Sequence, residues 1–140
     1  MPAQETGYAL TVDRVIVKVP PTAGHLALLR TAVGGFAARD HFTLDQVDDL
    51  RMAVEESAVQ LLRHVTGDFI TLEARATEAG VEVRVHADVA GSRPVIDESS
   101  FSWTILRALA DDLRIEMQYG HATVVLTKHR INLTSEPHHR

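Results

Sequence analysis

The chain has 140 residues and no cysteine, which is the length of one ordinary domain and excludes disulfides, thiolate metal sites and cysteine catalysis. Hydrophobic residues make up 45% of the sequence and charged residues 24%, which favours one packed core over disorder. The formal charge is −5 and the basic residues are dispersed, so no basic surface for nucleic acid is indicated. With no apolar run of 18 residues and no secretory signal pattern, we expect a cytoplasmic protein that binds a protein or a small molecule and not a membrane.

The first predicted element is a strand over residues 8 to 20, where apolar residues alternate with polar ones apart from one break near Asp13. Pro20 and Pro21 end this strand. Apolar residues then recur at three- and four-residue spacing, which predicts a helix that weakens toward Gly34 and Gly35. The apolar side of this helix consists of Leu26, Leu29, Val33 and Phe36.

A second helix is predicted to begin after Thr43. Thr43 and Gln46 match a capping box, in which a hydroxyl and a side-chain amide satisfy the free N–H groups of the first turn. Acidic residues follow in the first turns, where the helix dipole favours negative charge. The apolar stripe ends near Val65, so one face is expected in the core. That face consists of Val47, Leu50, Val54, Ala58, Leu61 and Val65.

From residue 69 onward the apolar period changes to two, which predicts a hairpin with its turn at residues 78 to 80. Residues 88 to 100 contain Gly91, Pro94 and several serines, and they predict a loop long enough to suggest a function. Two strands separated by a turn at Gly120 close the fold, and residues after about 133 are expected to fray. Between the loop and these strands lies a third helix with Phe101, Ile105, Leu106, Leu109 and Ala110 facing inward.

The order of elements is strand, helix, helix, strand, strand, helix, strand, strand. This order predicts an α/β (α+β) two-layer sandwich, in which three helices cover one face of a mostly antiparallel mixed sheet. The other face of the sheet would meet water or a partner. No internal repeat is evident, and we expect a single domain over residues 1 to 140.

Glu56 and Gln60 are the first candidates for chemistry. They lie four residues apart on the second helix and share a face that points away from its apolar stripe. One interpretation is a solvated polar face that includes Arg63. The other is a general base beside a residue that contacts a metal or a substrate, with both side chains directed into a pocket. The spacing alone does not separate the two.

Asp88 ends the second strand of the hairpin and is either an ordinary turn residue or a carboxylate directed at a ligand. One of Ser99, Ser100 and Ser102 is expected to cap the third helix. The eight histidines are scattered without the spacing of metal ligands. The sequence also contains no G-x-S-x-G elbow and no Walker loop, so it does not support a generic hydrolase or a P-loop enzyme.

Three segments resemble the motifs of a known family. Residues 49 to 60 read DLRMAVEESAVQ and precede His64, residues 101 to 112 read FSWTILRALADD, and Gly120 precedes TVVLTK at residues 123 to 128. They are similar to D-L-K-x-A-V-x-E-A-x-x-N, to G-L-G-L-x-L-I-x-x-L-x-D-E and to G-T-x-V-x-L-x-K. These motifs belong to the RsbW-type anti-sigma factors, serine-protein kinases with the histidine-kinase-like (GHKL) ATPase fold. The second segment most resembles the actinobacterial branch.

The resemblance implies roles for individual residues. Glu56 matches the catalytic glutamate, Gln60 matches the asparagine that holds Mg²⁺, and Asp88 matches the aspartate that bonds the adenine of ATP. The remaining positions of the nucleotide site, several of them glycine in the family, are Ala90, Ser92, Ser100, Ser102 and Thr123.

The substitutions at these positions change the expected chemistry. Side-chain carbons occupy places where bare backbone would approach adenine or phosphate, and Gln60 displaces the amide oxygen by about one methylene. Phosphoryl transfer depends on the placement of the metal and the phosphates. We therefore expect lost or weakened binding of ATP and Mg²⁺, with catalysis affected more than folding.

The resemblance still implies partner capture. Proteins of this type form homodimers, sequester an RNA polymerase sigma factor and release it to a STAS-domain anti-anti-sigma factor. Arg30 matches an arginine that touches protein partners, or else is an ordinary exposed arginine. Two alternatives stay open: an active serine kinase that phosphorylates the STAS-domain partner with Glu56 as base, and an α/β module that senses a small molecule.

Overall fold

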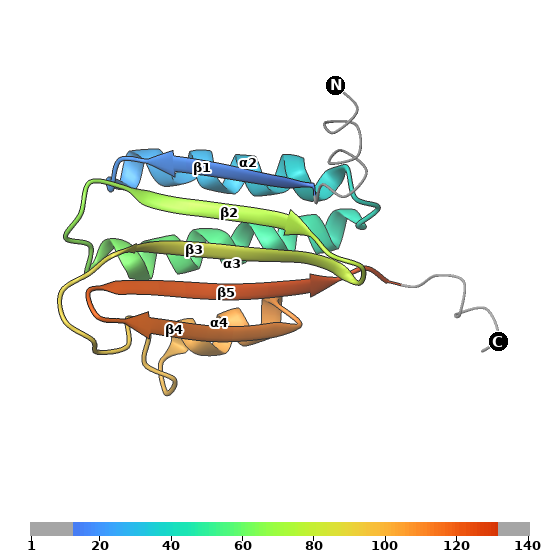
Figure 1. Cartoon of the computed structure of the whole chain (residues 1–140). Helices are drawn as coiled ribbons and strands as arrows, with labels where there is room; N and C mark the ends of the chain where they lie inside the picture. Colours follow the sequence, from blue (N-terminus) through green and yellow to red (C-terminus); the bar gives the residue numbers. More distant parts are fainter. Residues whose placement is uncertain (1–12, 132–140) are drawn as a thin grey trace, which may run out of the picture.

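The computed structural model describes residues 13 to 131, with one sheet and helices packed against a single face of it (Figure 1). Strand order across the sheet is β1-β2-β3-β5-β4, and each pairing is antiparallel. The predicted sandwich with three helices on one face is confirmed. The strands are β1 (Arg14–Val19), β2 (Ile70–Ala76), β3 (Gly80–Asp88), β4 (Asp112–Gln118) and β5 (His121–His129), and the helices are the short η1 (Ala23–His25), α2 (Leu26–Ala38), α3 (Leu44–Leu62) and α4 (Phe101–Leu109).

Helix α3 begins as the sequence predicts. The Gln46 backbone N–H donates to the Thr43 hydroxyl at 3.2 Å, and the Thr43 backbone N–H donates to the Gln46 side chain at 3.1 Å. The Gln46 amide also donates to the carbonyl of His129 on β5 at 2.7 Å. The cap therefore fixes both the start of α3 and its position over the sheet.

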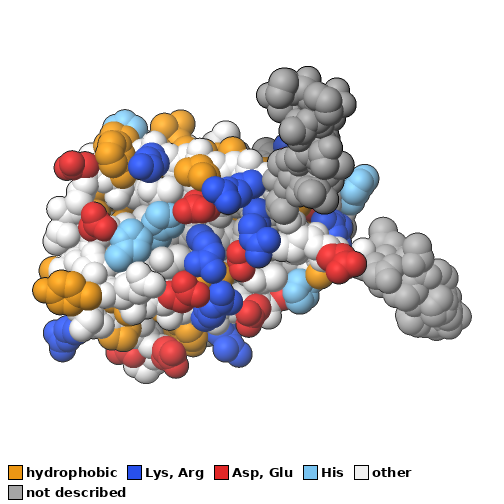
Figure 2. All heavy atoms as spheres, in the orientation of Figure 1, with side chains coloured by type: hydrophobic (Ala, Val, Ile, Leu, Met, Phe, Trp, Pro, Cys, Tyr) orange, Lys and Arg blue, Asp and Glu red, His pale blue; other side chains and the backbone are white. Residues whose placement is uncertain are grey.

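Each strand divides its residues between two faces, because the helices cover only one side of the sheet. On β3, Val83, Val85 and Ala87 are buried against the helices, whereas Arg84 and His86 lie on the opposite, open face. Figure 2 views the open face and shows basic, acidic and histidine side chains intermingled on it. The core thus lies entirely between the sheet and the helices.

The sequence predicts that Phe101 of α4 faces the core. This prediction is wrong, because 78% of the Phe101 surface is exposed. The one buried residue of α4 is Leu106, because this helix packs on α3 and the sheet through a narrow stripe and its first residue projects past both. Residues 8 to 12 of the first predicted strand and the tail after residue 133 lie outside the described residues. Among the helices of residues 13 to 131, none has both the length and the apolar content needed to cross a bilayer.

A buried ammonium group joins three elements of the fold. Lys128 of β5 points into the helix layer, where its Nζ donates to Asp49 Oδ2 of α3 at 3.1 Å and to the Leu109 carbonyl at the end of α4 at 2.8 Å. A charge that is this well buried requires compensating partners. Asp49 and Lys128 therefore fix the relative positions of α3, α4 and β5.

We predict that Asp49→Ala lowers the free energy of unfolding by about 1 to 2 kcal/mol, because it leaves the buried Lys128 without its counter-ion. Urea denaturation followed by circular dichroism measures this loss. Asp48→Ala is the matched control, since Asp48 is exposed and lies 3.5 Å from Arg51. It should change stability by less than about 0.5 kcal/mol. Equal effects of the two variants would contradict the role assigned to Lys128.

Candidate functional site

Glu56, Gln60 and Ser102 form a closed hydrogen-bonded triangle between α3 and α4. The Ser102 hydroxyl donates to Glu56 Oε2 at 2.5 Å. Gln60 Nε2 donates to the same Glu56 oxygen at 3.1 Å and lies 2.9 Å from Ser102 Oγ. All three side chains are half-buried. Glu56 and Gln60 therefore face α4, and neither projects into open solvent.

The orientation of Gln60 follows from its neighbours. A carboxylate only accepts hydrogen bonds, so the amide nitrogen must face Glu56. The amide oxygen then points to Arg63, whose Nη1 lies 3.4 Å away. A Mg²⁺ ion requires oxygen ligands, and here Gln60 directs its oxygen to a guanidinium instead of the space beside Glu56. As they lie, these residues do not fit a bound Mg²⁺ ion.

Asp88 does not join the Glu56 site. It lies at the end of β3 on the open face of the sheet, its side chain is 66% exposed, and its Oδ1 accepts a hydrogen bond from His121 Nδ1 at 2.8 Å. The last β3 residue facing the helices is Ala87, which has no polar side chain. Glu56 and Asp88 therefore lie on opposite sides of the sheet.

Asp88 instead ends a chain of polar side chains across three strands. Glu73 Oε2 of β2 lies 2.8 Å from His86 Nε2 of β3, and His86 Nδ1 lies 3.0 Å from His121 Nε2 of β5. The spacing of the histidines along the sequence does not indicate this chain of contacts. Their pairing depends on the strand register, in which Asp88 is opposite His121. The alternation along β3 does carry one signal, because it places Asp88 on the side opposite Ala87.

The other predicted cofactor residues do not gather at one place. Ala90 and Ser92 are exposed in the loop that follows β3. Ser100 caps α4, with its Oγ accepting from the Trp103 N–H at 3.2 Å, so the expectation that a serine caps this helix is confirmed. Thr123 of β5 lies opposite His86 of β3 on the open face of the sheet, where neighbouring side chains bury it. Of the matched set, the structure brings together only Glu56, Gln60 and Ser102.

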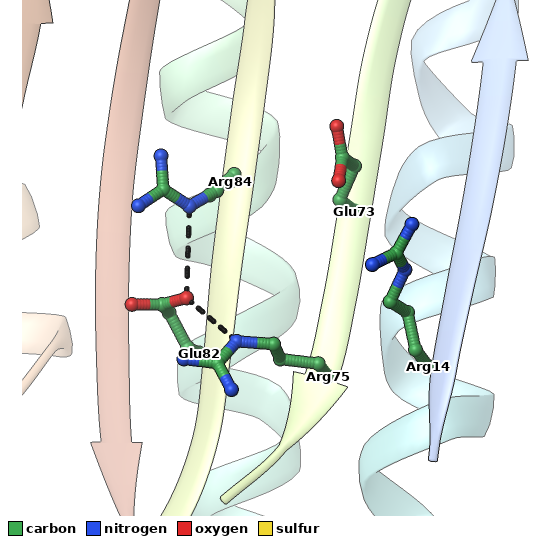
Figure 3. A pocket seen from close by; sticks show the side chains of 5 residues that line it. All are labelled: Arg14, Glu73, Arg75, Glu82 and Arg84. Atoms are coloured by element: carbon green, nitrogen blue, oxygen red, sulfur yellow. Dashed lines mark hydrogen bonds and ion pairs between the residues drawn. The ribbon is translucent and has the colours of Figure 1, made fainter. Parts of the chain in front are cut away.

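A small hollow of about 140 Å³ on the open face is lined by Arg14, Glu73, Arg75, Glu82 and Arg84 (Figure 3). Glu82 Oε1 lies 3.0 Å from Arg75 Nε and 3.6 Å from Arg84 Nε. Because one carboxylate contacts both guanidinium groups, their charge is partly neutralised within the protein. This arrangement fits a self-paired surface better than an anion site.

Arg30 lies in a shallow groove between α2 and α3 on the outer side of the helix layer. Its Nη1 pairs with Glu55 Oε1 at 2.8 Å, and within residues 13 to 131 its buried Nε has no hydrogen-bond partner. Met52, 53% exposed, lines the same groove. A fixed arginine beside an exposed apolar side chain is suited to protein contacts.

Sequence comparison finds relatives over most of the chain. It is 36% identical over 106 residues to the anti-sigma-F factor RsbW of Mycobacterium tuberculosis, covering 74% of this chain and 61% of that protein. It is 24% identical over 123 residues to the anti-sigma F factor of Clostridium acetobutylicum, covering 76% and 86%. A serine-protein kinase RsbW of Bacillus cereus is 23% identical over 139 residues, covering 84% and 85%. The chain spans about three fifths of the length of the Mycobacterium relative.

The fold agrees with the sequence comparison. A crystal structure of the RsbU and RsbW domains of a Mycobacterium tuberculosis protein matches with a TM-score of 0.64 at 18% identity, covering 83% of this chain and 32% of that one. No protein-family model matches the chain. The fold is thus an α/β sandwich of the kind found in RsbW proteins. The resemblance to the RsbW-type anti-sigma factors is confirmed.

We predict that Ser102→Ala lowers the free energy of unfolding by about 1 to 2 kcal/mol, since it removes a hydrogen bond to a charged group between two helices. Urea denaturation measures the loss. Ser92→Ala is the control because Ser92 is exposed in the loop, and it should shift stability by less than about 0.5 kcal/mol. A Ser102→Ala variant as stable as the parent protein would contradict a bond between α3 and α4 at this place.

Proposed function

We propose that this protein is an anti-sigma factor that sequesters a sigma factor through protein contacts, with lost or weakened binding of ATP. The Mycobacterium relative is named an anti-sigma-F factor, and the similarity covers most of this chain. One observation carries the proposal: the Glu56 carboxylate accepts hydrogen bonds from Ser102 and Gln60 of the protein itself. The groups that resemble a kinase site bond to one another, whereas exposed apolar and charged groups lie elsewhere.

The weakening of nucleotide binding has three supports. Gln60 turns its oxygen toward Arg63 and away from Glu56. Asp88 lies on the other face of the sheet from Glu56. A bound nucleotide would also have to break the Ser102 hydrogen bond to a carboxylate, which costs binding free energy.

The groove between α2 and α3 is the surface we propose for the partner. Arg30 is held there by Glu55, and its side chain, 35% exposed, presents a positive charge to a partner. The exposed Met52 supplies apolar surface in the same groove. By analogy with the family, the protein acts as a homodimer in the cytoplasm, and a STAS-domain anti-anti-sigma factor releases the sigma factor.

We predict that isothermal titration detects sub-micromolar binding of a sigma factor from the same genome without nucleotide. Titration with Mg-ATP alone should give a dissociation constant above about 1 mM, because the metal and adenine groups are separated. Micromolar binding of Mg-ATP would contradict the lost cofactor site. Failure of every sigma factor of that genome to bind would contradict the anti-sigma function.

The second candidate is an active serine kinase, favoured by the retained Glu56 and by the Bacillus cereus relative named a serine-protein kinase. Incubation with labelled ATP and the STAS-domain proteins of the same genome separates the two candidates. Under our proposal no phosphoserine forms. Phosphoserine that disappears with Glu56→Gln would establish the kinase instead.

We predict that Arg30→Ala weakens sigma-factor binding by about tenfold or more, because arginines at the centre of protein interfaces contribute strongly to affinity. Surface plasmon resonance measures the change. Arg107→Ala is the matched control, since Arg107 is an exposed arginine of α4, outside the groove, and should leave affinity within about twofold. Equal affinity of both variants would remove Arg30 from the partner surface.

A further inference from the structure

Two histidines on the open face of the sheet meet through their ring nitrogens. His86 Nδ1 of β3 lies 3.0 Å from His121 Nε2 of β5. The ring centroids are 5.0 Å apart, and the ring planes are inclined to each other by 52°. The rings therefore meet at their nitrogen-bearing edges and do not stack. Figure 2 shows histidine side chains next to each other on this face.

The outer nitrogen of each ring is bound to a carboxylate. His86 Nε2 lies 2.8 Å from Glu73 Oε2, and His121 Nδ1 lies 2.8 Å from Asp88 Oδ1. An ionised carboxylate only accepts hydrogen bonds, so both outer nitrogens carry a hydrogen and donate it. In a neutral imidazole the other nitrogen then has a lone pair and no hydrogen. Glu73 and Asp88 thus direct two lone pairs at each other between the rings.

Two lone pairs at this distance repel each other unless a positive charge lies between them. A single proton can fill the place, and it leaves one ring charged. A divalent transition-metal ion serves both rings at once, since neutral imidazole nitrogen is a common metal ligand in proteins. A carboxylate on the far nitrogen is also typical of a metal-bound histidine, because it fixes the orientation of the ring and raises its basicity.

We propose that His86 and His121 bind a Zn²⁺ ion, with Glu73 and Asp88 as the hydrogen-bonded supports of the two ligands. The ion takes the place of the shared proton, which leaves to water. Two nitrogens bound at about 2.0 to 2.1 Å to a tetrahedral Zn²⁺ ion are about 3.3 Å apart. The facing nitrogens therefore need to separate by about 0.3 Å from their present positions.

The remaining coordination positions would be open to solvent. Among residues 13 to 131, no group of three or more histidine and carboxylate side chains could hold a metal ion, so the protein supplies two ligands. His86 and His121 line a hollow of about 320 Å³. This hollow has room for the water molecules that complete a four-coordinate ion.

The charges around this hollow favour a cation. Asp68 and Asp88 line it together with one basic residue, Lys18, so the lining is negative overall when both rings are neutral. The Lys18 ammonium group lies over the Phe69 ring, 5.5 Å from the ring centroid. A hollow with net negative charge attracts divalent cations.

The site is separate from the surface proposed for the sigma factor. His86 and His121 lie on the open face of the sheet, whereas Arg30 lies on the outer side of the helix layer. A bound ion would leave the groove beside Arg30 unoccupied. Zinc binding and partner capture can therefore be measured independently.

Isothermal titration of the full chain with Zn²⁺ tests the site. His138 and His139 lie outside the described residues, so both are replaced by alanine in the parent protein and in every variant. This parent should bind Zn²⁺ with a dissociation constant below about 100 µM. His86→Ala and His121→Ala should each weaken binding by about tenfold or more, because each removes one of two protein ligands. His64→Ala, at an exposed histidine after α3, is the matched control and should stay within about twofold of the parent.

Glu73→Gln tests the supporting carboxylates. It should weaken Zn²⁺ binding by about tenfold or more, since a neutral amide raises the basicity of the His86 ring less than a carboxylate does. Glu82→Gln is its control, because Glu82 contacts Arg75 and Arg84 instead of a histidine. Equal weakening by the two variants would show a general effect of charge and would overturn the arrangement proposed.

Nuclear magnetic resonance gives a second readout. Zn²⁺ should shift the imidazole resonances of His86 and His121 and leave those of His64 unchanged. Circular dichroism establishes that each variant is folded.

A parent protein that binds no Zn²⁺ up to about 1 mM overturns the proposal, and the two rings then share only a proton. Binding that survives in both His86→Ala and His121→Ala overturns it as well. None of these measurements involves a sigma factor or a nucleotide, so a negative result would leave the anti-sigma function standing. Loss of sigma-factor binding would likewise leave a positive zinc titration intact.

Discussion

The organisation of this molecule depends on one constraint: the helices cover a single face of the sheet, and successive residues of each strand point to opposite faces. Neighbouring positions in the sequence therefore enter different environments. Ala87 packs under the helices, while Asp88 joins the histidines of the open face. The same rule separates Glu56, on the helix side, from Asp88, although both match a single site in related proteins. A difference of one residue along β3 thus decides whether a ligand could bridge them.

The contact between α3 and α4 is made by hydrogen bonds among residues that match a catalytic site in the family. Gln60 has a side chain one methylene longer than asparagine, and its amide reaches Glu56 and Ser102 at the same time. Ser102 donates to the carboxylate from a position where the family has a flexible glycine. Both substitutions turn groups suited to a ligand toward one another. In this structure the Glu56 carboxylate therefore bonds to the protein itself.

The surfaces that remain available are suited to proteins. The open face of the sheet carries ion pairs and a histidine chain that largely satisfy one another. The groove beside Arg30 instead combines a guanidinium group held by Glu55 with the exposed apolar side chain of Met52.

The sequence by itself determined the local elements, because periodicity and capping act over a few residues. The stripe after Thr43 predicted α3 and its capping box, and the order of elements predicted the layered fold. The four-residue spacing also identified Glu56 and Gln60 as neighbours on one face of the helix. Only the tertiary structure decided that Ser102, 46 residues from Glu56, completes their triangle, and that His86 meets His121. Such contacts depend on strand register and on the placement of one helix against another, which no short-range pattern specifies.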